Sequence, residues 1–159
     1  MIDSGLHFKK ESRLNNPENT PQQKIADEAS AFCRLLNLYF MKKYSYRKEP
    51  TSLGVGNNIC VQRSRVYLYL RFKAKIAGFM HLNPIVIAAI DFRRSRKGDG
   101  TEFLRFLVRQ APQFGIDSIA IECPHSEAIR SFGKKFGFER INQNYLVANI
   151  CTLQTKLNH

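Results

Sequence analysis

The 159-residue sequence predicts a mixed α/β fold, with a central, mostly antiparallel sheet and flanking helices. Segments with the apolar spacing of helices alternate along the chain with short runs rich in β-branched and aromatic residues. Two of these runs, 85–92 and 116–123, are almost wholly apolar, which is typical of strands buried on both faces of a sheet. Because a helix-like segment lies between them, the order of elements indicates at least one parallel βαβ crossover.

The N-terminal part of the chain predicts a strand, a loop and a long helical segment. Leu6 and Phe8 alternate with polar neighbours, which favours a short strand over 6–11. Residues 15–22 form a loop by composition, and Thr20 or Asn19 is a suitable N-cap for a helix that starts there. From 22 to 43 apolar residues recur at helical spacing, so we expect one long helix or two short ones.

The middle of the chain predicts a strand and its hairpin partner. Residues 48–58 contain two glycines and are expected to form a loop. In 61–72, β-branched and aromatic residues nearly alternate with polar ones, which predicts a strand. We expect 74–82 to be its hairpin partner, because Pro84 then marks a break before the next strand.

The C-terminal half predicts strands and helices in alternation. The expected order is a strand at 85–92, a helix at 99–113, a strand at 116–123, a helix at 126–136, and a closing pair of strands at 138–143 and 144–153. Gly137 directly follows the second of these helices, at the position where glycine commonly ends a helix. The last few residues are expected to fray.

The composition is that of an ordinary globular protein. With 43% hydrophobic and 11% aromatic residues, we expect 1–159 to form one domain with its own core. No apolar run approaches the roughly 20 residues of a membrane span, and the first residues lack the apolar stretch of a secretory signal. We therefore expect a cytoplasmic protein that does not bind membranes. The four cysteines and four histidines are scattered, which favours free or buried thiols and no metal site.

The charge of the chain indicates an anionic partner. The formal net charge is +12, and part of it gathers at 93–97. A phosphorylated cofactor, a nucleic acid and an acidic substrate all suit such a surface, although positive charge also keeps a protein soluble. The hypothesis of a DNA-binding regulator is supported by the charge alone, because the sequence contains neither a helix-turn-helix nor an RNP-like run.

The stretch "RRSRKGDG", 93–100, predicts an anion site. Gly98 and Gly100 lie between a buried strand and a helix, where glycine allows close approach of the backbone to a ligand. The unpaired N–H groups of a helix N-terminus bind phosphates well. The stretch is not a Walker loop, because no GK[ST] comes after it, and Phe103 occupies the place of the third glycine of a dinucleotide fingerprint. A tight strand-to-helix turn without a ligand is the alternative.

Three motifs, in order, resemble those of the GCN5-related N-acetyltransferases (GNAT). "SRKGDG", 95–100, resembles their [RQ]xxGxG/A pyrophosphate loop, and "SEAIRSFGKKFGF", 126–138, resembles their NxxAxxxYxxxGF element. "KIAGF", 75–79, is similar to the hairpin that precedes the loop strand in the family. The likeness runs from Val61 to Phe138 and implies a GNAT-like fold, in which the parallel strand pair splays apart.

The resemblance implies that acetyl-CoA binds at this loop. Its pantetheine arm would contact the backbone of Ile90 and Phe92, and Ser126 stands at the family's asparagine position. Side chains at 93, 94, 96 and 97 are expected to add charge-assisted contacts to the adenosine phosphates. The diphosphate would lie on the loop itself, which comprises Ser95, Arg96, Lys97, Gly98, Asp99, Gly100 and Thr101.

The sequence departs from the family at the catalytic positions. Gly133 stands where many members have the tyrosine that protonates the leaving thiolate, and residues 83–85 lack the usual base glutamate. Glu122 and Asp91 are the nearest candidates for a general base. Glu122 lies in an apolar stretch, which makes a carboxylate a better proton acceptor. Tyr145 is a candidate proton donor from another direction.

The leading hypothesis is therefore an acetyl-CoA-dependent N-acyltransferase that acts on an amine. The positive charge favours an acidic or nucleic-acid-bearing acceptor. The alternative is a catalytically degenerate member that binds CoA, nucleic acid or a protein partner. Cys123 is expected to be a small buried residue rather than a nucleophile, because His125 is poorly placed to activate it. A homodimer through the last strand or the aromatic run 67–72 is a further possibility.

Overall fold

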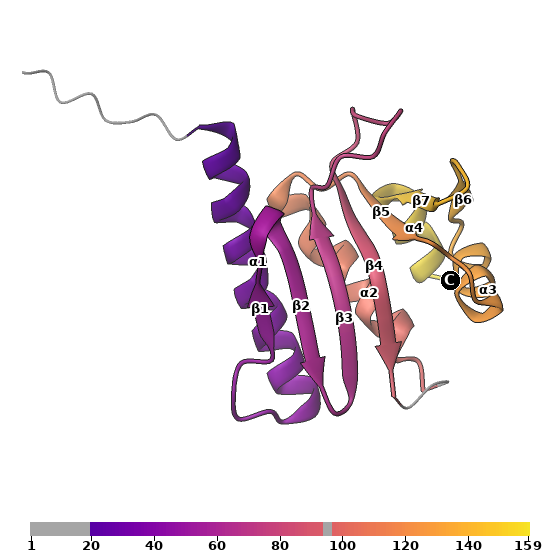
Figure 1. Ribbon diagram of the computed structural model, residues 1–159. Coiled ribbons are helices and arrows are strands. Elements are labelled where there is room, and N and C mark those ends of the chain that lie inside the picture. Colours follow the sequence, from indigo (N-terminus) through magenta and orange to yellow (C-terminus); the bar gives the residue numbers. More distant parts are fainter. Residues whose placement is uncertain (1–19, 94–96) are drawn as a thin grey trace, which may run out of the picture.

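The computed structural model describes residues 20–93 and 97–159, which form a seven-stranded mixed sheet flanked by helices (Figure 1). The expected strand at 6–11, and the expected ligand positions 94–96, including Ser95 and Arg96, lie outside the described residues. In chain order the elements are α1 (Pro21–Tyr44), β1 (Thr51–Leu53), β2 (Asn58–Arg63), β3 (Val66–Phe72), β4 (Pro84–Phe92), α2 (Asp99–Gln110), β5 (Ser118–Glu122), α3 (Glu127–Lys135), β6 (Glu139–Arg140), β7 (Tyr145–Asn149) and α4 (Ile150–Leu157). A short 3₁₀ turn, η1 (Val55–Asn57), precedes β2, and a second one, η2 (Ala111–Phe114), comes after α2.

The order of strands confirms the predicted fold class. Across the sheet it is β1-β2-β3-β4-β5-β7-β6. Among the described strands, β4 and β5 pair in parallel and every other neighbouring pair is antiparallel. The two apolar runs of the sequence are thus the central strands, and α2 makes the crossover between them.

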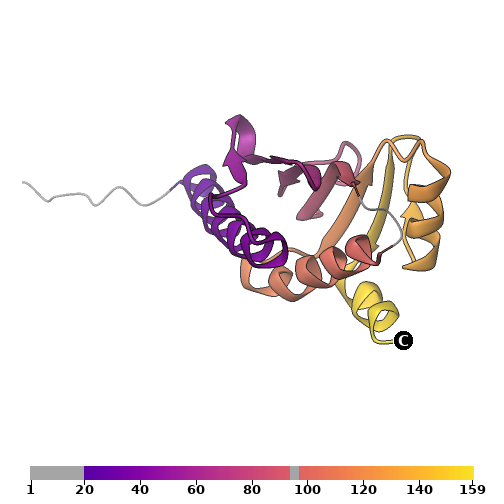
Figure 2. The ribbon, with the colours of Figure 1, turned by 90° about the horizontal axis from the view of Figure 1, so that it is seen from below.

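Helices cover one face of the sheet, and the other face is largely open. Figure 2 shows α1, α2 and α4 along the same side of the sheet. The alternation of β3 matches this arrangement: Leu68 and Leu70 are fully buried in the main core, whereas Tyr67 is exposed. A smaller cluster of Ile76, Val86 and Ala120 lies apart from that core.

The helix at 21–44 is single, and its start agrees with the sequence signals. The Thr20 side chain accepts a hydrogen bond from the Gln23 N–H at 3.2 Å, and Pro21 occupies the first turn. The chain leaves the helix through Ser45, whose φ is 55°. Of the two expected alternatives, one long helix or two short ones, the structure has the first, and the C-terminal end of α1 lies beside the turn between β2 and β3 (Figure 1).

The predicted hairpin between 61–72 and 74–82 is wrong. The run 61–72 itself contains the turn, because Ser64 and Arg65 separate β2 from β3. Residues 74–82 form turns, with φ at 81° for Gly78, and bury Ile76 while Met80 stays exposed. The apolar residues of this segment led to the prediction of a strand, although their spacing is irregular. The family-like "KIAGF" lies in a loop.

Two short elements differ from the expected loop and strand. Thr51–Leu53 forms the edge strand β1, held to α1 because the Thr51 N–H donates to the buried Asn37 side chain at 3.0 Å. Ile150–Leu157 is helical rather than strand, because Asn149 accepts a hydrogen bond from the Thr152 N–H at 2.7 Å and caps a new helix. The closing strand therefore ends at Asn149.

We predict that Tyr39→Phe leaves the protein as stable or more stable. The Tyr39 ring stacks on Phe106, with centroids 4.4 Å apart, but its hydroxyl is buried without a hydrogen-bond partner. Removing an unsatisfied buried hydroxyl is expected to raise the free energy of unfolding by about 1 kcal/mol. Urea denaturation at neutral pH measures this, with the exposed Tyr67→Phe as control. A loss of more than about 1 kcal/mol would show that the hydroxyl has a partner.

The same variant is expected to resist alkali better. Burial raises the pKa of Tyr39 above its ordinary value. As pH rises above about 10, the unfolded chain loses this proton before the folded chain does, so the native protein loses stability. Phenylalanine has no proton to lose, and the difference in melting temperature between variant and native protein should widen as the pH rises above about 10.

Candidate active site

The parallel strands β4 and β5 separate halfway along β4. Their pairing runs from Pro84↔Ser118 to Ile87↔Ile121 and stops there, although β4 continues to Phe92. In Figure 1, β4 continues alone after β5 turns away towards α3. Among the described residues no strand pairs with this edge of β4 beyond Ile87, so its backbone groups are available to an extended ligand.

A β-bulge lies at the point of separation. Tyr69 of β3 pairs with Ala89, and the next residue, Leu70, pairs with Ile87, so Ala88 is an extra residue on β4. Bulges of this kind bend a strand and commonly lie next to active sites. The bulge coincides with the end of pairing to β5, and it turns the second half of β4 away from its parallel neighbour.

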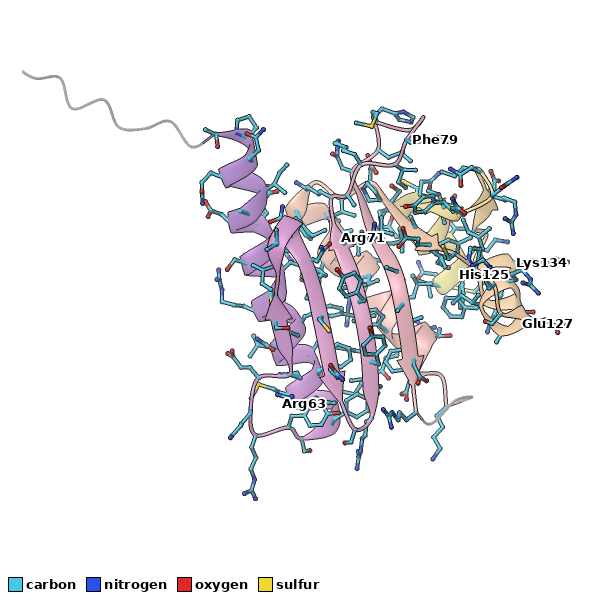
Figure 3. The ribbon with its side chains drawn as sticks, in the orientation of Figure 1. Arg63, Arg71, Phe79, His125, Glu127 and Lys134 are labelled. Carbon is cyan, nitrogen blue, oxygen red and sulfur yellow. The ribbon has the colours of Figure 1, made fainter. Side chains whose placement is uncertain are left out.

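Glu122, Tyr145 and Arg71 meet at this point on the open face of the sheet. Glu122 is the first residue of β5 beyond the last pair with β4, and it faces Tyr145 of β7. The Tyr145 hydroxyl donates to Glu122 Oε1 at 2.8 Å, and an Arg71 terminal nitrogen lies 3.3 Å from Glu122 Oε2. Figure 3 labels Arg71 on β3. The structure thus brings together two of the three predicted catalytic side chains.

The environment of Tyr145 keeps its proton in place. Burial raises the pKa of Tyr145, and the hydrogen bond to the Glu122 carboxylate raises it further. The Arg71 guanidinium acts in the opposite direction. The hydroxyl is therefore protonated at neutral pH and is available as a proton donor.

Asp91 lies away from this group. It is exposed and pairs with Tyr67, further along β4 towards its C-terminal end. The backbone-binding candidates Ile90 and Phe92 flank it, with side chains packed against the main core. Their positions are on the part of β4 that has left β5, as a backbone role would require.

The N-terminus of α2 comes shortly after β4 and carries the predicted glycines. Gly98 has φ of 78°, a left-handed conformation that favours glycine, and its carbonyl accepts the Glu102 N–H at 2.9 Å. The N–H groups of Asp99, Gly100 and Thr101 precede that first intrahelical bond, so they are free for an anion. A Cβ on Gly100 would lie 3.4 Å from the Phe132 ring of α3, so this first turn packs against α3.

A lysine from α1 balances the acidic residues of this turn. The Lys43 ammonium lies 3.0 Å from Asp99 and also pairs with Glu102. Burial alone would lower the pKa of Lys43, but its hydrogen bonds to Glu102 and Asp99 outweigh burial and raise it. Burial, and next the Asp99 carboxylate, raise the pKa of Tyr44 to about 12. Lys43 therefore stays charged and withdraws both carboxylates from a ligand at the helix end.

Lys97 and Ser126, two predicted cofactor-binding residues, lie in different surroundings: Lys97 lines a pocket and Ser126 caps a helix. Lys97 is exposed and lines a pocket of about 200 Å³ together with Tyr44 and Arg65. Ser126 caps α3, because its side chain accepts the Ile129 N–H at 3.2 Å. That cap accounts for the serine without a ligand, and contact with a cofactor stays a prediction.

Gly133 cannot hold the missing tyrosine. It is buried, and a Cβ there would lie 3.0 Å from Leu146 Cδ1 and 3.5 Å from Phe138 Cβ. The position that aligns with the family's tyrosine therefore points into the packing between α3 and β7. The proton donor, if the protein has one, must come from another element.

The prediction that Cys123 is buried is wrong. Its side chain is exposed, and its backbone has φ of 48°, held by a hydrogen bond of 2.7 Å from its N–H to the Asn144 carbonyl. The chain turns sharply here to leave β5, which exposes the residue after Glu122. Sequence reasoning also missed Arg71 and Lys43, because their partners depend on strand register and on the packing of α1 against α2, which no local pattern reveals.

Within the described ranges, 20–93 and 97–159, no group of three or more His, Cys, Asp or Glu side chains could hold a metal ion. No helix in those ranges is both long and apolar enough to span a membrane.

The strand order, the diverging parallel pair and the helix directly after β4 define a GNAT-like fold, as the resemblance predicts. Among the solved structures that are similar to this chain are acetyltransferases of the GNAT family. Neither a protein-family model nor a curated protein matches the sequence.

Three of these structures illustrate the likeness. The KacTA–DNA complex is 15% identical over 79% of this chain and 85% of that chain, with a TM-score of 0.46. An acetyltransferase of the GNAT family from Listeria monocytogenes 4b F2365 is 9% identical over 79% of this chain and 90% of that chain, with a TM-score of 0.44. AtaTR bound with acetyl-CoA is 16% identical over 62% of this chain and 68% of that chain, with a TM-score of 0.42. Because identities and TM-scores are this low, the likeness adds nothing about the reaction, acceptor or partners of this chain.

Proposed function

We propose that the protein, with 1–159 as one domain, is an acetyl-CoA-dependent N-acetyltransferase that acts on an amine. The observation that carries the proposal is the separation of β4 from β5 beyond Ile87↔Ile121, with Glu122 and Tyr145 at its start. An unpaired strand edge suits an extended, amide-containing arm, and the N-terminus of α2 suits a diphosphate. The four free cysteines fit a reducing compartment such as the cytoplasm.

The residues present fit acetyl-CoA. The free N–H groups from Asp99 to Thr101 would hold the diphosphate, and the Lys43 pairs keep the nearby carboxylates neutralised. The backbone of β4 at Ile90 and Phe92 would hold the pantetheine arm. When bound, acetyl-CoA supplies an acetyl thioester to the acceptor.

Two side chains would then move protons. Glu122 accepts a proton from the acceptor amine at a carboxylate oxygen, which leaves a nucleophilic nitrogen. Tyr145 holds a proton on its hydroxyl, donates it to the leaving group, and regains one from Glu122 through their 2.8 Å hydrogen bond. Arg71 positions the Glu122 carboxylate through the other oxygen. The net charge of +12 favours an acceptor that is acidic or carries nucleic acid.

A second candidate is a binding protein without catalysis. The observation that favours it is Gly133, which is packed too tightly against Leu146 for a tyrosine. Such a protein would bind CoA, nucleic acid or a protein partner with the same fold. Release of CoA from acetyl-CoA in the presence of an amine panel separates the two candidates, because the binding protein gives no release above background.

Titration calorimetry with acetyl-CoA tests the cofactor assignment. Gly100→Asp places a negative charge beside the free N–H groups of α2 and is expected to weaken binding at least about 10-fold. Gly100→Ala is the matched control, because a methyl group at 3.4 Å from Phe132 fits with little adjustment. Absence of binding by the native protein, or equal losses in the two variants, would contradict a diphosphate on this helix.

A further inference from the structure

We infer that the end of the sheet beside the C-terminus of α1 and the β2–β3 turn is a docking surface for single-stranded nucleic acid. We call this surface the basic end, and it consists of five exposed side chains: Lys42, Arg47, Lys48, Arg63 and Arg65. In the proposed acetyltransferase, this surface would bind an acceptor that carries nucleic acid. The binding test below does not depend on acetyl transfer.

The fold, and not the sequence order, assembles the basic end. The last turn of α1 and the segment after it carry the first three residues, and the end of β2 and the turn after it carry the two arginines (Figure 1). An Arg63 terminal nitrogen donates to the Glu49 carbonyl at 2.8 Å, and the Arg65 guanidinium lies 5.9 Å from the Tyr44 ring centroid. These two contacts fix the segments side by side. Figure 3 labels Arg63 at this end of the sheet.

The charge of the basic end is not compensated. None of the ion pairs among the described residues includes any of its five cations. Two exposed carboxylates lie near it, Glu49 beside Lys48 and Asp91 opposite Tyr67, so five cations still leave positive charge in excess. Elsewhere the lysines 43 and 73 and Arg71 do have carboxylate partners. An unpaired cluster of like charges is unfavourable by itself and is neutralised by a polyanion.

The shape of the basic end favours a chain of phosphates over a single one. Its residues extend from the end of α1 across β2 and β3, and adjacent strands are about 4.8 Å apart. Arg93 continues it on β4, because its N–H donates to the Arg65 carbonyl at 3.2 Å. A single phosphate neutralises only part of such a row, whereas successive phosphates of a nucleic acid strand run along it.

An aromatic side chain next to the basic end favours exposed bases. Tyr67 lies two residues after Arg65 on the open face of β3 and is 37% exposed, although neighbouring core positions of the same strand are fully buried. Bases of single strands stack on exposed aromatic rings, which an acidic peptide or a duplex does not do. Cations along one edge and an aromatic ring beside them match a single strand.

Fluorescence anisotropy with a labelled single-stranded RNA of about 12 nucleotides tests the inference over a range of salt concentrations. Arg47→Gln with Lys48→Gln removes two exposed cations that are in none of the ion pairs among the described residues. The double variant should bind about 3- to 10-fold more weakly, and the slope of log affinity against log salt should fall by about 1.4. Arg109→Gln with Lys134→Gln, exposed cations outside the basic end, is the matched control and should bind as the native protein does.

Four results would overturn the inference: no binding at about 50 mM salt, equal losses in both double variants, equally tight binding of polyglutamate, or tighter binding of a duplex. Calorimetry of the Arg47→Gln, Lys48→Gln variant with acetyl-CoA separates this inference from the proposed function. The variant should bind acetyl-CoA as tightly as the native protein, whether or not RNA binding is lost.

Discussion

Glu122→Gln is expected to lower kcat/KM for acetyl transfer about 10²- to 10⁴-fold and to leave acetyl-CoA affinity within about twofold. The amide has the shape of the carboxylate, and its oxygen still accepts the hydrogen bond that Tyr145 donates to Glu122 at 2.8 Å. It cannot take a proton from an amine. The measurement is CoA release with the best amine of a panel, beside calorimetry with acetyl-CoA.

Asp91→Asn is the matched control for this prediction. The sequence also predicts Asp91 as a base, but it is exposed and lies opposite Tyr67, away from the point where β4 and β5 separate. Its variant should keep nearly full activity. If Asp91→Asn loses activity and Glu122→Gln does not, the base is on β4 and the assignment to Glu122 fails.

Tyr145→Phe is expected to lower kcat about 10- to 100-fold and to change the alkaline side of the pH profile. Burial and the Glu122 hydrogen bond raise the pKa of Tyr145, so the native enzyme keeps its proton donor until the pH exceeds about 10. Native activity should therefore fall in that range, and the variant should show no such fall. A variant with the native alkaline fall would assign the proton donor to another group.

Most of the fold could be predicted because long elements have strong periodic patterns. The helix at 21–44 and the apolar strands β4 and β5 were visible in the sequence, and so was the parallel crossover between them. The errors fall on short elements. Residues 74–82 contain enough apolar side chains for a strand, but only Ile76 among the side chains of this segment is buried. The chain turns at Gly78, so the segment forms a loop. Asn149 ends β7 by capping a helix, which tertiary context selects over a longer strand.

Less of the candidate site could be predicted. Gly98 and Gly100 were found because a strand, a glycine pair and a helix are consecutive in the chain. Glu122 and Tyr145 were separate candidates in the sequence, and only the register Glu122↔Tyr145 shows that they share a hydrogen bond. Arg71 reaches Glu122 across β4, a contact between strands that are not neighbours, so no spacing along the chain signals it.

Gly133→Tyr, which restores the family's tyrosine, is expected to destabilise the protein by more than about 3 kcal/mol and to restore no activity. A Cβ alone would lie 3.0 Å from Leu146 Cδ1, and a phenol ring would have to displace Leu146 and Phe138 from the core. Urea denaturation measures the loss.

Two smaller changes keep this prediction testable if the tyrosine variant fails to fold. Gly133→Ala should cost about 1 kcal/mol, because only a methyl group meets the end of the Leu146 side chain. Leu146→Val removes the Cδ1 atom that lies 3.0 Å from the added methyl, so the double variant should be more stable than the sum of the single changes implies. Additive losses, or a Gly133→Tyr protein of native stability, would show that position 133 has room for a side chain. In that case close packing would no longer explain why position 133 carries a glycine instead of the family's tyrosine.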